Sequence, residues 1–182
     1  MSYHLRSAEP DEIPEICRLI CEMSPWTDYE ITADVLLKAF QTGSPRQLWV
    51  SVSPSGELAG TVSFRVNNCY EHLLMRGGWP ILAHKFGLDE NEKDRDAPRL
   101  PNGAYVHNLA VFPGHQGKGV GEALLHEAER QAREHGDRMF LMVSDFNPRA
   151  QKFYERQGYE FLGAIPDCIA PGKAEHVMMK IL

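Results

Sequence analysis

The chain has 182 residues, of which 43% are hydrophobic, and this suits a single globular domain, residues 1–182, with an ordinary core. Its formal net charge of −6 and pI near 5.7 provide no basic surface for nucleic acid or for an anionic membrane. The sequence contains no apolar run long enough to span a membrane and no signal-peptide core near its start, so we expect a cytoplasmic protein.

The first third of the chain alternates between helical and strand-like patterns. Apolar residues recur every three or four positions over 11–23 and again over 32–43, which predicts two amphipathic helices. Strand-like alternation covers residues 3–6, 47–52 and 58–66. Two aromatic residues, Trp26 and Tyr29, lie in the break between the helices. They either cap the core or line a pocket for a substrate.

Residues 67–102 follow no clear pattern and are too long for a hairpin loop. A short helical stretch is expected from Tyr70 to Met75, a second apolar patch extends to Phe86, and a charged run follows from Asp89 to Asp96. We interpret the segment as an insertion, or as a lid, that precedes the central strand. Its charged run is expected to be a solvated surface.

The last part of the chain is predicted to alternate strands and helices. Apolar strands are expected over 104–112, 139–144, 159–164 and 176–182. Helices are expected from residue 120 to about Gly136, and from Asn147-Pro148 to Gly158. The fold class is therefore α+β, with a mixed central sheet of about seven strands flanked by about four helices.

Four cysteines are scattered through the chain at positions 17, 21, 69 and 168. They do not form the closely spaced pairs of a metal site, so we interpret them as reduced packing residues and expect no metal cofactor.

Residues 115–121, His-Gln-Gly-Lys-Gly-Val-Gly, separate the strand 104–112 from the next helix. Glycines at 117, 119 and 121 allow a sharp turn and a close approach to a ligand. The unpaired amides and the positive dipole end of the helix would bind phosphate oxygens. A P-loop would need Ser or Thr after its final Gly-Lys, and a dinucleotide fingerprint would place its third glycine one residue later. Both nucleotide motifs are therefore disfavoured.

The remaining pattern is Gln-x-x-Gly-x-Gly at residues 116–121, after the apolar strand. Asn147 follows, and then Phe153-Tyr154-Glu155-Arg156-Gln157-Gly158-Tyr159. In order and spacing, residues 104–163 resemble the GNAT superfamily of acyl-CoA-dependent N-acyltransferases. The resemblance implies the GNAT-like fold and a binding site for acetyl-CoA.

The resemblance also implies which residues bind acetyl-CoA. The strand would offer the backbone of Leu109, Ala110 and Val111 to the pantetheine arm. The pyrophosphate would lie on the loop and helix start, which comprise Gln116, Gly117, Lys118, Gly119, Val120, Gly121 and Glu122. Lys118 could equally be a solvated surface lysine. Asn147 corresponds to a cofactor contact, although a helix N-cap is an equally natural role for it.

Acetyl transfer to an amine needs a base, a stabilised oxyanion and a proton donor for the thiolate. Tyr154 matches the family's tyrosine and would be the general acid, the alternative being a packed core tyrosine. His107 is the leading candidate for the base because an ordinary histidine pKa lies near 6.5. Its alternative is a structural histidine. The backbone amide of Leu109 could stabilise the oxyanion.

We therefore expect an N-acetyltransferase that transfers the acetyl group of acetyl-CoA to a primary amine of a small molecule, by direct attack in a ternary complex. The acceptor would lie near Trp26 and Tyr29, the insertion 67–102 and the loop 165–173. Two alternatives stay open: a protein or peptide N-acetyltransferase, and a non-catalytic sensor that binds acyl-CoA. No nucleic-acid or membrane partner is expected, and a homodimer is compatible with this interpretation.

Overall fold

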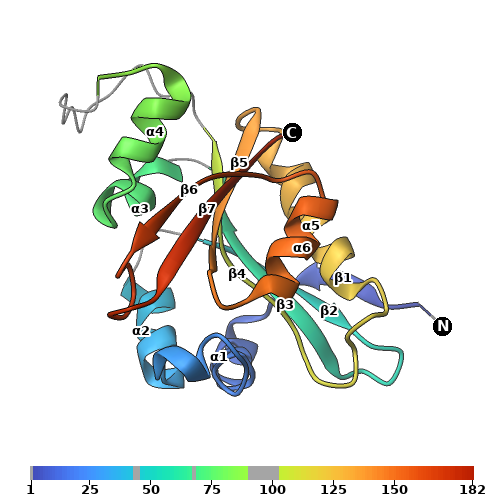
Figure 1. Cartoon of the computed structure of the whole chain (residues 1–182). Helices are drawn as coiled ribbons and strands as arrows, with labels where there is room; N and C mark the ends of the chain where they lie inside the picture. The colour runs from blue at the N-terminus through green and yellow to red at the C-terminus, as the bar shows by residue number, and fades with distance from the viewer. Residues whose placement is uncertain (1, 43–45, 67–68, 90–102) are drawn as a thin grey trace. The chain divides into compact units, whose positions relative to one another are not determined.

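Seven strands and six α-helices make up the described part of the computed structural model, which covers residues 2–42, 46–66, 69–89 and 103–182 (Figure 1). The α+β class and the expected seven strands are confirmed. Four of the helices are the expected ones, and the other two lie in the insertion. No helix in these described ranges is long and apolar enough to cross a membrane. The chain divides into two compact units, Met1–Arg65 with Val106–Arg130, and Val66–Tyr105 with Gln131–Leu182.

The first unit contains strands in the order β1, β2, β3, β4. Their bounds are β1 His4–Ser7, β2 Gln47–Val52, β3 Leu58–Arg65 and β4 Ala104–Val111, of which the last six residues belong to this unit. In the antiparallel ladder Val50 of β2 pairs with Arg6 on one side and with Thr61 on the other. The predicted hairpin is therefore present.

Three helices accompany these strands: α1 (Ile13–Cys21), α2 (Ala33–Thr42) and most of α5 (Val120–Ala132). The apolar spacing of α1 places Ile16, Cys17 and Ile20 on one buried face. A core cluster forms from Ile16, Cys17, Ile20, Leu36, Val50, Ala110 and Phe112. It joins α1 and α2 to the end of β4, the strand that leads into the glycine loop.

The predicted role of the cysteines is confirmed for the three whose side chains are described. Cys17, Cys21 and Cys168 are free thiols. Burial raises the pKa of Cys17 to about 11, so this thiol stays protonated near neutral pH. The side chain of Cys69 lies outside the described residues.

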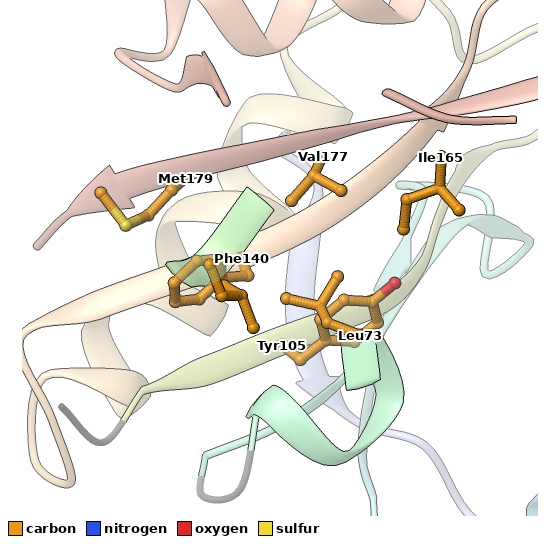
Figure 2. Packing of buried hydrophobic residues seen from close by; sticks show 7 residues of the cluster. Leu73, Tyr105, Phe140, Ile165, Val177 and Met179 are labelled. Atoms are coloured by element: carbon orange, nitrogen blue, oxygen red, sulfur yellow. The ribbon is translucent and has the colours of Figure 1, made fainter. Parts of the chain in front are cut away.

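The second unit contains β5 (Arg138–Ser144), β6 (Glu160–Pro166) and β7 (Ala174–Ile181), with β7 in the middle. Both neighbours pair with β7 in the antiparallel sense. Helix α6 spans Pro148–Arg156. Figure 2 shows the core of this unit, in which buried side chains from different elements pack together. Its members are Leu73, Leu82, Tyr105, Phe140, Ile165, Val177 and Met179.

The insertion contributes two helices to this second core. They are α3 (Cys69–Met75) and α4 (Trp79–Phe86), and their Leu73 and Leu82 are fully buried. The helical stretch expected up to Met75 is therefore confirmed, whereas the apolar patch up to Phe86 forms a helix, α4, that was not predicted. Residues 67–68 and 90–102, which include most of the charged run, lie outside the described residues.

Gly60 marks the tightest contact among β3, β4 and α5. A Cβ atom at this position would lie 2.7 Å from the carbonyl oxygen of Ala110 and 3.1 Å from Cγ1 of Val120. The first of these atoms belongs to the backbone of a paired strand and cannot move without disturbing the sheet. Gly163 is crowded in a different way, because its Cβ would meet the Ile81 side chain, with Cγ1 at 2.9 Å.

We expect Gly60→Ala to lower the free energy of unfolding by about 1–3 kcal/mol, the usual cost of overpacking a core. Gly163→Ala is the matched control, and its loss should be smaller because a side chain can repack. Urea denaturation measures both through the shift of the midpoint at constant slope. Equal losses would show that contact with the Ala110 carbonyl is not what limits this position.

Candidate functional site

The second half of β4 carries the first group of predicted site residues. His107, Leu109 and Val111 are half-buried and alternate with the buried Asn108 and Ala110. The Asn108 amide donates a hydrogen bond of 3.0 Å to the Ser63 hydroxyl on β3. This buried bond adds a side-chain link between the two strands. It leaves His107, Leu109 and Val111 together on the other face of β4.

The loop after β4 is fastened at its beginning. The Gln116 side chain donates to the carbonyl of Val111 at 3.2 Å, and the His115 amide donates to the carbonyl of Phe112 at 3.1 Å. The Tyr3 hydroxyl lies 3.1 Å from Nδ1 of His115. Gln116 therefore holds the loop against the end of the strand.

Two glycines turn the chain into α5. Gly117 and Gly119 have φ angles of +73° and +80°, which L-residues with a side chain rarely adopt. A Cβ atom on either would have no heavy atom within 4 Å among the described residues. Backbone conformation, rather than lack of space, therefore requires glycine at both positions. Gly121 lies in the first turn of α5.

Several backbone amide donors lie close together at the start of α5. The Ala123 amide makes the first bond of the helical pattern, to the carbonyl of Gly119 at 3.0 Å. The amides of Val120, Gly121 and Glu122 precede it and have no i−4 partner within the helix. The positive end of the helix dipole lies at the same place. Such an arrangement can hold phosphate oxygens, and Lys118, exposed on the preceding turn, adds a positive charge.

Asn147 is the N-cap of α6, which is one of the two roles expected for it; the other is a contact with the cofactor. Its Oδ1 accepts a hydrogen bond of 3.1 Å from the Ala150 amide, and Pro148 occupies the first helical position. The side chain of Gln151 donates to the carbonyls of Ser144 and Asp145, both at 3.0 Å. These bonds fix the start of α6 next to the end of β5. The Asn147 side-chain NH₂ is not used by the cap.

Tyr154 lies on α6 and is buried within the second unit. Its ring makes edge-on contacts with Phe153 and Tyr159, at centroid distances of 5.2 and 5.7 Å. Burial raises the pKa of the Tyr154 phenol, so the hydroxyl remains a proton donor at neutral pH. The residue is thus a packed core tyrosine whose phenol stays protonated at neutral pH and is a weaker acid than that of an exposed tyrosine.

Trp26 and Tyr29 lie between α1 and α2, around the short 3₁₀ turn Thr27–Tyr29. Both are half-buried. Trp26 packs against the core cluster that contains Ile16 and Leu36. This is the core-capping role, the first of the two roles considered for it from the sequence. Glu30 ends the turn in a left-handed conformation with a φ of +54°.

One group of polar residues was missed by sequence reasoning. Ser144 and Glu175 are directly paired across β5 and β7, and both are buried. The Ser144 hydroxyl donates to Oε1 of Glu175 at 2.8 Å. A single serine and a single glutamate next to apolar runs provide no local pattern, and only strand pairing brings them together.

Comparisons with known proteins agree with this layout. Residues 13–159 match the family described as Acetyltransferase (GNAT) family. Streptothricin acetyltransferase of Streptomyces lavendulae is 39% identical over 59 residues, which cover 32% of this chain and 31% of that protein. Blasticidin-S acetyltransferase of Streptomyces morookaense is 36% identical over 78 residues, which cover 43% of this chain and 57% of that protein. The matched stretches thus span less than two thirds of these relatives.

Solved structures show the same fold. Arabidopsis thaliana NAA60 in complex with acetyl-CoA aligns with a TM-score of 0.73 at 14% identity, covering 100% of this chain and 99% of that chain. At such low identity the likeness establishes the fold alone. The family match, by contrast, extends over well over half of the sequence and includes β4, the glycine loop, α5 and Tyr154. The chain therefore belongs to the acetyltransferase (GNAT) family.

Proposed function

We propose that the protein is an acyltransferase that moves the acetyl group of acetyl-CoA to a primary amine of a small molecule. The observation that carries the proposal is the group of backbone amides at the start of α5, which follows β4 through the glycine loop. Family membership and relatives named as acetyltransferases of streptothricin and of blasticidin-S support it. Single-domain organisation, a lid role for 67–102, a cytoplasmic location and a homodimer remain predictions.

The first unit supplies the proposed cofactor site. Leu109, Ala110 and Val111 would offer main-chain groups to the pantetheine arm, as the family resemblance implies. The pyrophosphate would bind the amides from Gly117 to Glu122, assisted by Lys118. Gln116 would act indirectly, because its side chain already donates to the carbonyl of Val111. Acetyl-CoA supplies the activated thioester.

The proposed chemistry needs proton transfer at both ends of the reaction. A free alkylammonium has a pKa near 10.4, so a base is needed to produce the neutral amine at neutral pH. We assign this role to His107 and the protonation of the CoA thiolate to Tyr154. The backbone amide of Leu109 would stabilise the tetrahedral oxyanion, and Trp26 and Tyr29 would bind the acceptor.

Glycine replacement tests the anion site. Gly119→Ala should cost about 1–2 kcal/mol of stability, because alanine must adopt a left-handed φ. If the chain relaxes to avoid this strain, the amides lose their alignment and acetyl-CoA should bind about tenfold more weakly, which is about 1.4 kcal/mol. Calorimetric titration with acetyl-CoA measures the change.

Gly56→Ala is the control for this experiment. Gly56 has a φ of +88°, has no heavy atom within 4 Å of an added Cβ in the described structure, and lies in the β2–β3 hairpin. Its stability loss should be similar and its acetyl-CoA affinity unchanged. Equal weakening of acetyl-CoA binding in the two variants would contradict the anion site.

Asn147 can be tested separately as a cap and as a cofactor contact. Asn147→Ala should lower the unfolding free energy by about 1 kcal/mol, the typical loss for an N-cap. Asn147→Asp keeps the oxygen that accepts from Ala150 but removes the NH₂ donors and adds a negative charge. This variant should retain stability while binding acetyl-CoA more weakly. Wild-type affinity in Asn147→Asp would leave Asn147 as a cap only.

The acid and the base can be distinguished by a pH–rate profile. Tyr154→Phe should lower kcat by about 100-fold or more, the usual contribution of general acid catalysis, without changing acetyl-CoA affinity. His107→Ala should remove the acidic limb of the kcat/KM profile, where wild-type activity rises as the imidazole loses its proton. The assay follows CoA release over a panel of amines.

Tyr159→Phe is the control for Tyr154, because it removes a hydroxyl from the neighbouring buried ring. It should leave kcat unchanged. Full turnover in Tyr154→Phe would refute its role as the acid, and an unchanged acidic limb in His107→Ala would refute the base. If acetyl-CoA binds tightly and no amine releases CoA, the sensor alternative is favoured.

A further inference from the structure

The loop between β4 and α5 is fixed at both ends by the core. Phe112, which follows β4, and Val120, which begins α5, are both buried. Residues 113–119 lie between them, all within the described structure, and every one except His115 is exposed. His115 is half-buried. It is therefore the side chain through which the middle of the loop packs against the rest of the first unit.

The glycines of this loop make such an anchor useful. Gly114, Gly117 and Gly119 have φ angles of +84°, +73° and +80°. A glycine backbone has more conformations to lose than that of any other residue, so ordering three of them in one short loop is unfavourable. A loop that becomes ordered only when an anion arrives binds that anion more weakly, because the ordering opposes binding. A fixed residue between Gly114 and Gly117 reduces this cost.

The partner of His115 is Tyr3, which directly precedes β1. The Tyr3 hydroxyl lies 3.1 Å from Nδ1 of His115, and either tautomer of the imidazole can complete a hydrogen bond at this distance. The two rings also meet edge to face, with centroids 5.8 Å apart and planes at 86°, which is a preferred geometry for aromatic pairs. Tyr3 is itself half-buried, so both contacts are partly shielded from water.

Strand register explains how two residues 112 positions apart come to meet. His4, the neighbour of Tyr3, pairs with Val52, the last residue of β2. At the exit of β4, the Phe112 amide donates to the carbonyl of Ala59, the second residue of β3. The start of β1, the β2–β3 turn and the exit of β4 therefore lie at the same end of the ladder. At that end, Tyr3 links the first strand to the loop that follows the fourth.

His115 thus has two attachments within the first unit. Its backbone amide donates to the carbonyl of Phe112 at 3.1 Å, and its side chain contacts Tyr3. The loop amides of 117–119 follow it directly and would share the pyrophosphate with those of 120–122, which belong to α5. A displacement of His115 would move the first group relative to the second. The alignment of the two groups therefore depends on where His115 is held.

We propose that Tyr3 is a positioning residue for the acetyl-CoA site, which holds His115 so that the amides of 117–119 stay aligned with the start of α5 in the free protein. Tyr3 acts through His115 and needs no contact with the ligand. Its contribution is pre-organisation, because the loop has its binding conformation before the anion arrives. This inference rests on the proposed function for the identity of the ligand, but the order of the loop can be measured without any ligand.

Calorimetric titration with acetyl-CoA measures the two contacts of Tyr3. Tyr3→Phe removes the hydroxyl and keeps the ring, and it should weaken binding about threefold, because the binding conformation is then populated for only part of the time. Tyr3→Ala removes both contacts and should weaken binding about tenfold, which is about 1.4 kcal/mol. Both variants should raise the KM for acetyl-CoA while keeping kcat and the KM for the amine. An unchanged KM for acetyl-CoA in Tyr3→Ala would overturn the inference.

Substitutions of His115 show whether Tyr3 acts through it. His115→Ala should weaken acetyl-CoA binding about as much as Tyr3→Ala, and Tyr3→Phe should add nothing in this background. His115→Asn places an amide group where Nδ1 lies and can keep the bond to the Tyr3 hydroxyl, so it should restore most of the affinity. Tyr3→Phe should weaken binding again in the His115→Asn background. Additive losses in Tyr3→Phe combined with His115→Ala would contradict the proposed link.

A ligand-free experiment follows the motion of the loop itself. Backbone amide relaxation measured by NMR should give order parameters of about 0.85 for the three loop glycines in the wild-type protein. Tyr3→Ala should lower these values or add microsecond-to-millisecond exchange at the same residues. Gly56, the left-handed glycine of the β2–β3 hairpin, is the internal control and should not change. A loop that stays equally ordered in Tyr3→Ala would overturn the inference.

His4→Ala is the matched control for the substitutions of Tyr3. His4 is exposed on β1, next to Tyr3, so its replacement tests whether any disturbance of this strand weakens the site. Acetyl-CoA affinity and loop order should keep their wild-type values, and a loss equal to that of Tyr3→Ala would contradict the inference. Urea denaturation shows whether each variant folds. Tyr3→Leu replaces Tyr3→Ala if the latter does not, with the same expected loss of affinity.

The results also distinguish this inference from the proposed function. Acetyl-CoA binding and CoA release that do not depend on Tyr3 would support acetyl transfer and overturn the role of Tyr3. Acetyl-CoA binding that depends on Tyr3, with no CoA release from any amine, would support that role and contradict acetyl transfer. Absence of acetyl-CoA binding by the wild-type protein would overturn both.

Discussion

The position of the first turn of α5 depends on its contact with β3 and β4. Val120, the first residue of this helix, is buried, and its side chain lies against Gly60 together with that of Leu124. A side chain at Gly60 would collide with the carbonyl oxygen of Ala110 on β4 and crowd the Val120 and Leu124 side chains of α5. The amides at the start of α5 are therefore aimed by core packing. The left-handed glycines only allow the loop to reach that fixed point.

Burial gives Tyr154 two properties at once. The ring packs between Phe153 and Tyr159, and the same loss of water keeps the phenol protonated. Asn147 similarly divides its side chain, with the oxygen on the helix and the NH₂ group unused by the cap. In both residues the structural role leaves the atoms required for the proposed chemistry in place. The alternatives weighed from the sequence are therefore compatible with each other.

The parts of the molecule that the sequence predicts well are those with local patterns. Helix α1 follows from apolar spacing, the β2–β3 hairpin from two alternating runs around a Pro-Ser-Gly turn, and α6 from Asn147-Pro148. The buried contact between Ser144 and Glu175 has no such pattern. Ser144 ends an apolar strand, and Glu175 precedes the residue at which the last strand was expected to begin. Their contact arises from pairing between strands about thirty positions apart, which local periodicity does not encode.

The proposed donor and acceptor sites differ in how the chain would recognise the ligand. Backbone amides at a helix start bind an anion whatever the side chains are, so the sequence records the donor site only through the glycines that shape it. An acceptor would instead be recognised by side chains, which come from elements far apart in the chain. Such residues can change without disturbing the core, provided that their volume and burial are kept. A family can therefore share its glycine loop while its members differ in the amines they accept, and the acceptor must be inferred from the three-dimensional structure.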